Sequence, residues 1–73
     1  MIYHGYGIQP APRHLDTGQW GLNLFILWSS NDEERTRHFY TIDEYATEEE
    51  ARTHCLAYGQ QIIDGKIPGS AVG

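Results

Sequence analysis

The stretch TEEEARTHCLAYGQQIIDG, residues 47–65, decides the fold of this chain because several local rules agree on one helix there. Thr47 and Glu50 have the spacing of a capping box, in which each side chain bonds the other residue's free backbone N–H. Three successive glutamates fill the first turn, where the helix dipole favours negative charge. A stripe of apolar residues recurs at helical spacing: Ala51, Cys55, Tyr58 and Ile62. Gly65, followed by Pro68, is typical of a helix end.

Three stretches before this helix are predicted strands. Residues 2–9 are rich in aromatic and β-branched residues, and Pro10 and Pro12 behind them favour an edge position, because proline cannot donate to a neighbouring strand. Residues 20–29 place large apolar side chains at every second position, and residues 35–42 follow after a polar loop. We therefore expect an α+β fold in two layers, a three-stranded antiparallel meander packed against one C-terminal helix (β-β-β-α).

The length and the cysteine content limit how such a domain is stabilised. We expect one domain over residues 1–65 and a flexible tail over residues 66–73, which is rich in small residues. A chain of 73 residues buries only about 60% of its unfolded surface. A single cysteine excludes an internal disulfide, and no Cys and His residues have zinc-finger spacing. Association with a second copy remains as a way to bury more surface, so the sequence favours a homodimer.

The charge and the hydropathy narrow the class of partner. The net charge is −5 and the isoelectric point is about 5.1, and an acidic chain repels nucleic-acid phosphates unless its few cations cluster. No apolar run approaches the roughly 18 residues that a membrane span needs. The N-terminus lacks the pattern of a signal peptide. We expect a cytoplasmic protein that does not bind membranes.

The pairing of the two long predicted strands suggests which residues the sheet exposes. The polar loop predicts that Ser30 pairs with Arg35. The same register gives three further pairs: Ile26 with Phe39, Leu24 with Thr41, and Trp28 with Arg37. The face that the helix leaves uncovered then carries four candidate interface residues: Phe25, Leu27, His38 and Tyr40. Exposed apolar patches usually mark interfaces. A slip by one residue would swap the faces of the third strand and leave Phe25 and Leu27 in place.

No combination of residues predicts catalysis, a metal site or a cofactor site. The histidines lack metal-ligand spacing: His4, His14, His38 and His54. Cys55 lies on the apolar stripe of the helix, where we expect a small buried residue rather than a nucleophile. The carboxylates near the helix start fit the helix dipole and a solvated surface: Asp43, Glu44, Glu48, Glu49 and Glu50. The sequence therefore predicts that the protein is not an enzyme.

Three arginines support an alternative reading. Arg35 and Arg37 alternate along the third predicted strand, so they share one face of the sheet beside Trp28. Arginines next to aromatic side chains can bind nucleic acid, although a cation–π or ion-pair role at the surface uses the same residues. With Arg13 they carry most of the positive charge, and a nucleic-acid site at these three residues is the alternative hypothesis.

The order of motifs from residue 6 to residue 65 resembles that of known proteins. A YGI-x-P start, the stretches FILW and RTRHF, and the helix entry YATEEEA are similar to a group of small single-domain bacterial proteins of uncharacterised function. This resemblance implies a strand–strand–strand–helix fold and no activity. The topology is also similar to the N-terminal DNA-binding domains of tyrosine integrases, which implies DNA contacts around Arg35 and Arg37. This chain differs from that family in its acidic charge and in the acidic hairpin NDEE.

The residues therefore favour a non-enzymatic interaction module. Its expected partner is itself, as a homodimer formed through the sheet, or another protein. Nucleic acid is the less favoured partner, because the net charge is negative.

Overall fold

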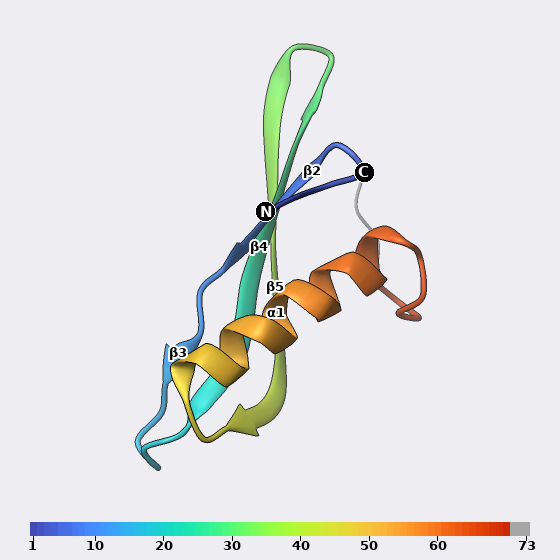
Figure 1. The fold of residues 1–73 in the computed structure, drawn as a ribbon. Coiled ribbons are helices and arrows are strands. Elements are labelled where there is room, and N and C mark those ends of the chain that lie inside the picture. The colour runs from blue at the N-terminus through green and yellow to red at the C-terminus, as the bar shows by residue number, and fades with distance from the viewer. Residues whose placement is uncertain (71–73) are drawn as a thin grey trace.

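A computed structural model describes residues 1–70 as one antiparallel sheet with a helix across one of its faces (Figure 1). The elements, in chain order, are β1 (Ile2–Tyr3), β2 (Tyr6–Pro10), β3 (Arg13–His14), β4 (Trp20–Ser30), β5 (Glu33–Tyr45) and α1 (Glu48–Ile63). The expected α+β class with a C-terminal helix is confirmed. The expected number of strands is wrong, because the described residues form five strands rather than three.

The additional strands arise because a turn divides the predicted first strand, residues 2–9, and because a further short strand forms after it, at Arg13–His14. His4 and Gly5 both adopt positive φ, 50° and 84°, and this two-residue turn folds β1 back onto β2, so that Ile2 pairs with Gly7. Such turns favour glycine, which has no side chain to clash at positive φ. After Pro10 the ladder to β4 stops, and it resumes at β3. Both short strands lie at the edge of the sheet, and Pro10 lies in β2 beyond the residues that pair with β1, on the open edge that proline favours.

The β4–β5 hairpin turns more tightly than the polar sequence suggests. Asn31 and Asp32 form a two-residue turn with φ of 52° and 63°, so Ser30 pairs with Glu33 and not with Arg35. Asn and Asp tolerate this left-handed conformation better than most residues. The expected register is thus wrong by two residues along the outer part of the hairpin. A two-residue slip keeps every side chain on its expected face.

The expected register reappears at the other end of the same hairpin. Trp20 pairs with Tyr45, beyond the predicted end of the third strand at Ile42, and an irregularity between Gly21 and Asn23 separates the two registers. At that point Gly21 pairs with Glu44 and Asn23 with Tyr40, so β5 accommodates two extra residues. Bulges of this kind locally disrupt pairing and increase strand twist.

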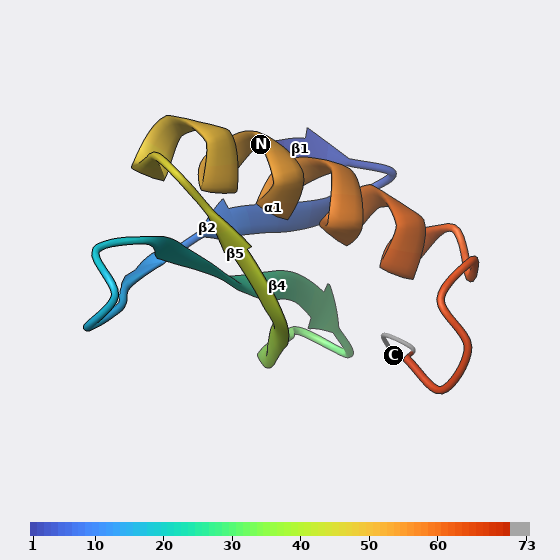
Figure 2. The ribbon, with the colours of Figure 1, turned by 90° about the horizontal axis from the view of Figure 1, so that it is seen from below.

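Helix α1 begins and ends where the sequence predicts. The Thr47 hydroxyl accepts a hydrogen bond of 3.1 Å from the backbone N–H of Glu50. At the other end, Gly65 has a φ of 74° and donates its N–H to the carbonyl of Ile62. The helix lies across one face of the sheet only, and that arrangement is clear from below (Figure 2).

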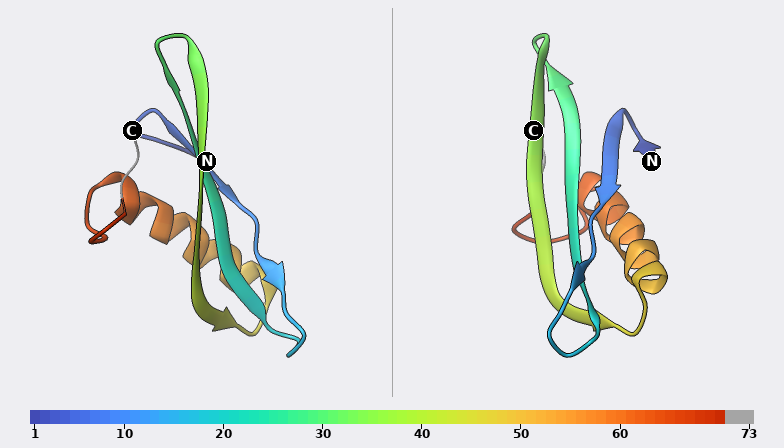
Figure 3. Two further views of the ribbon diagram at one scale, coloured as in Figure 1. Left: turned by 180° about the vertical axis from the view of Figure 1, so that it is seen from behind. Right: turned by 90° about the vertical axis from the view of Figure 1, so that its left-hand side faces the viewer.

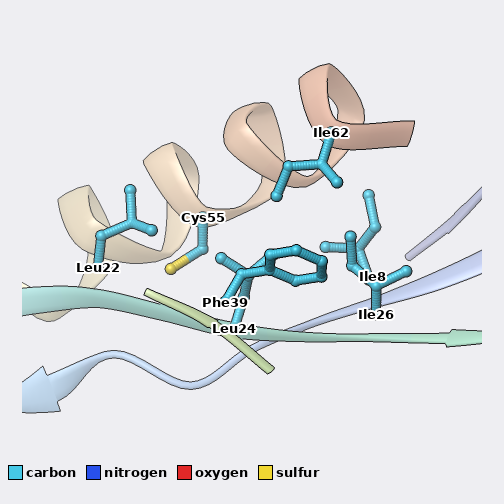
Figure 4. Close-up of a cluster of buried hydrophobic side chains, with 7 residues drawn as sticks. All are labelled: Ile8, Leu22, Leu24, Ile26, Phe39, Cys55 and Ile62. Carbon is cyan, nitrogen blue, oxygen red and sulfur yellow. The ribbon is translucent and has the colours of Figure 1, made fainter. Parts of the chain in front are cut away.

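The core lies between α1 and the face of the sheet beneath it (Figure 4). Its most buried side chains come from four elements: Ile8, Leu22, Leu24, Ile26, Phe39, Ala51, Cys55 and Ile62. Tyr58 of the predicted stripe packs half-buried against the core, and Gly59, which the stripe did not include, is buried. A Cβ at Gly59 would lie 2.8 Å from Cγ2 of Ile8. Glycine therefore lets α1 approach β2 and β4 closely.

The segment after α1 continues along the core. Ile67 is half-buried and packs against the core cluster, while residues 71–73 of the expected flexible tail lie outside the described residues. Within residues 1–70, α1 is too short and too polar to cross a membrane.

Candidate interaction surface

The face of the sheet opposite α1 is the leading candidate site, and we call it the second face. It is defined by six residues of β1, β4 and β5: Ile2, Phe25, Leu27, Thr36, His38 and Tyr40. Directly paired residues share a face, and Phe25 pairs with His38 while Leu27 pairs with Thr36. The structure thus brings together all four interface residues predicted from the sequence. No helix or strand within residues 1–70 covers them.

The second face exposes large apolar groups. The exposed fraction is 77% for Ile2, 37% for Leu27 and 66% for Tyr40, whereas Phe25 is half-buried. A groove of about 460 Å³ passes Ile2 and Leu27. Its floor includes Gly7, where a Cβ would approach Leu27 to 3.8 Å. The groove is open, and its lining also includes Glu34 and Arg35, which suits a protein contact with a polar rim better than an enclosed small ligand.

A buried amide holds the middle of the second face in place. Asn23 is 6% exposed, and its Nδ2 donates to the carbonyl of Ala11 at 3.0 Å. The Oδ1 of Asn23 must therefore accept from the Nε2–H of His38, at 2.5 Å. The His38 ring stacks on Phe25 at 4.8 Å between centroids and lies 5.5 Å from Tyr40. The aromatic centre of the face is thus fixed before any partner binds.

Asn23 is a functional candidate that the sequence reasoning missed. Its signal was a single amide side chain within the most apolar strand, WGLNLFILWS. A buried polar side chain needs hydrogen-bond partners, and the partners of Asn23 come from segments far from it in the chain. The amide was visible in the sequence, but its partners were not.

The three arginines of the alternative hypothesis do not form one surface. Arg35 pairs with Trp28 in β4, so it lies on the helix side of the sheet as predicted, and Arg37 lies on the same side. Arg13 pairs with Gly21, which places it on the opposite face, near the other end of β4. Arg35 also forms a 3.0 Å ion pair with Glu33. The guanidinium of Arg37 lies 5.4 Å from the ring centroid of Phe39.

The remaining titratable residues occupy structural positions. Cys55 is buried, and its Sγ contacts the backbone oxygen of Asn23 at 3.2 Å. His54 stacks on Tyr45 at 4.3 Å, and burial raises the pKa of Tyr45 above its usual value. The part of the chain that the structure describes contains no cluster of three His, Cys, Asp or Glu residues that could hold a metal ion.

Comparison with known proteins finds no matching family model, no matching curated protein and no matching solved structure. The resemblances suggested by the sequence therefore stay predictions, and the second face is the basis for a functional proposal.

Proposed function

We propose that the protein is a non-enzymatic interaction module that self-associates through its second face. The observation that carries this proposal is the exposure of Ile2, Leu27 and Tyr40 on the sheet face opposite α1. Contiguous apolar groups in water mark an interaction site. In a homodimer, a twofold axis places this patch of one copy against the same patch of the other. One contact would therefore cover the apolar groups of both copies.

The side chains of the second face are suited to contact with the same face of a second copy. Its centre consists of Phe25, Leu27, Thr36, His38 and Tyr40, and none of these side chains is charged when the histidine is neutral. Two copies can therefore meet without burying an unpaired charge, which would oppose binding strongly. Aromatic side chains at the centre of such a contact usually dominate its energy. The net charge of −5 opposes self-association, so we expect the dimer to tighten as salt screens that repulsion.

Sedimentation equilibrium of the full chain tests the proposal. We expect a dimer at micromolar concentration. Phe25→Glu should shift the protein toward monomer, and Tyr40→Glu should do the same without disturbing the fold, because Tyr40 is 66% exposed. Ala57→Glu introduces the same charge on the exposed side of α1 and should leave the dimer unchanged.

Two results would contradict self-association. A wild-type protein that stays monomeric up to about 1 mM, where the binding free energy is only about −4 kcal/mol, would exclude the homodimer. Equal effects of Tyr40→Glu and Ala57→Glu would show that the second face is not the contact surface.

A further inference from the structure

Strand β5 has one edge that no other strand covers. β5 spans Glu33–Tyr45 and pairs along one side with β4. Within residues 1–70, no strand pairs with its other side, and no loop supplies backbone hydrogen bonds to it. In the side view, β5 lies at the border of the sheet away from α1 (Figure 3, right). An uncovered edge is a template for pairing with another extended chain.

The tight turn determines which backbone groups point outward from this edge. The turn places a hydrogen bond between Ser30 and Glu33, the first and last of its four residues. Paired residues of an antiparallel ladder then alternate between hydrogen-bonded and non-bonded pairs. Glu34 therefore lies in a pair without backbone hydrogen bonds to β4. The same holds for every second residue after it: Thr36, His38 and Tyr40. Their N–H and C=O groups point away from β4, toward an incoming strand.

The charges on β5 disfavour a second copy as that strand. When two copies of β5 pair about a twofold axis, residues with outward-pointing backbone groups must lie opposite each other. Because these residues alternate along the strand, the axis passes through one residue and not between two. The two longest such pairings have their axes at Thr36 and at Arg37. The first places Arg35 opposite Arg37, and the second places Arg37 opposite itself. Like charges directly opposite destabilise a sheet.

Self-pairings with the twofold axis at other residues join fewer residues of β5. With the axis at Glu34, the turn limits pairing to residues 33–35. With the axis at His38, the irregularity opposite Gly21 and Asn23 limits it to residues 36–40. The free edge of β5 is therefore poorly matched to its own copy, whereas carboxylates opposite Arg35 and Arg37 would match it well.

We propose that the outer edge of β5 binds an extended acidic segment of another protein, which adds to the sheet as a further strand. The outward N–H and C=O groups of β5 would supply the hydrogen bonds, and acidic residues at alternate positions would lie opposite Arg35 and Arg37. Glu33 already holds Arg35 in an exposed ion pair, which a partner carboxylate can replace at little energetic cost. This site uses the backbone groups of Thr36, His38 and Tyr40, whereas the second face uses their side chains, so peptide binding and self-association are measured separately.

A capped peptide of sequence VVTETETK is a suitable probe, because antiparallel pairing places its glutamates opposite Arg35 and Arg37 and its lysine opposite Glu33. The charge-reversed peptide VVTKTKTE is its matched control. We expect the first to bind about tenfold more tightly, since each exposed ion pair contributes modestly. In the charge-reversed variant Arg35→Glu, we expect this preference to disappear or reverse. Equal binding of both peptides to the wild-type protein would refute the charge match.

Backbone pairing has its own test. The probe N-methylated at its three threonines lacks three of the four N–H groups that face β5 and should not bind. Hydrogen exchange should be fast at Glu34, Thr36 and His38 in the free protein and slow once the probe is bound. Thr36→Pro removes an outward donor and should abolish binding while keeping the fold, whereas Thr36→Val should bind normally. Unchanged exchange at these amides under saturating probe, or no detectable binding up to millimolar probe, would overturn the proposal.

Discussion

Replacing Gly59 with alanine tests how closely α1 approaches the sheet. In a solvated helix this change would stabilise the protein by about 1 kcal/mol, because glycine is a poor helix former. At this position the new Cβ would lie 2.8 Å from Cγ2 of Ile8 and 3.2 Å from Cδ1 of Leu24. The first distance is shorter than side-chain atoms tolerate, and inserting a methyl group into a packed core costs about 1–3 kcal/mol. We expect the clash to outweigh the helix propensity and give a net loss of about 1 kcal/mol.

The assay is chemical denaturation with a double-mutant cycle. Ile8→Ala removes the clashing atom and by itself should cost about 2–5 kcal/mol, because Ile8 is 2% exposed. In the Ile8→Ala background, Gly59→Ala should become neutral or stabilising, so the two changes are coupled. Ala57→Gly, at an exposed position of the same helix, measures the propensity effect alone.

One outcome would refute this reasoning. If Gly59→Ala stabilises the wild-type protein by as much as Ala57→Gly destabilises it, only helix propensity acts at Gly59. The helix would then lie farther from β2 than the structure shows.

Three further predictions concern the helix cap, the hydrogen bond between Tyr3 and Asp64, and DNA binding. Thr47→Ala removes the 3.1 Å cap on the N–H of Glu50 and should cost about 0.5–2 kcal/mol by denaturation; an unchanged midpoint would contradict the cap. The Tyr3 hydroxyl donates to Asp64 at 2.8 Å, which raises the pKa of Tyr3, so stability from this bond is lost as pH rises through that raised pKa. Asp64→Asn should lower the pKa of Tyr3 in an ultraviolet titration. Finally, duplex DNA at physiological salt should show no mobility shift, because a chain of net charge −5 can release few counterions. Micromolar binding that weakens with salt would favour the nucleic-acid hypothesis over self-association.

Local rules predicted the helix well, because its signals lie within its own residues. The cap at Thr47 and the glycine end at Gly65 are both present. Apolar periodicity placed Tyr58 on the stripe, where it packs half-buried against the core, but did not reveal the buried Gly59. A glycine inside a helix is unfavourable unless close packing requires it, and that was the available signal.

The sheet was predicted less well, because its register depends on turns. The dipeptide Asn31-Asp32 favours a left-handed two-residue turn, but its polar neighbours suggested a longer loop. Phe25, Leu27, His38 and Tyr40 nevertheless lie on the expected face, since the resulting error was two residues and side chains alternate with a period of two. Ile2 and Thr36 of the second face were not predicted. The irregularity in β5 and the hydrogen-bond partners of the Asn23 amide depend on segments distant in the chain, so local patterns did not reveal them.

The contact between β2 and α1 joins nearly the first and the last elements of the chain, and this has a consequence for synthesis on the ribosome. Ile8 meets Gly59, and Tyr3 meets Asp64. The strands are synthesised before the 16 residues of α1. At about 5–20 residues per second, the helix takes about 1–3 s to synthesise. During that interval α1 cannot yet cover the apolar side of β4, so strand pairing that precedes the helix leaves this side unprotected.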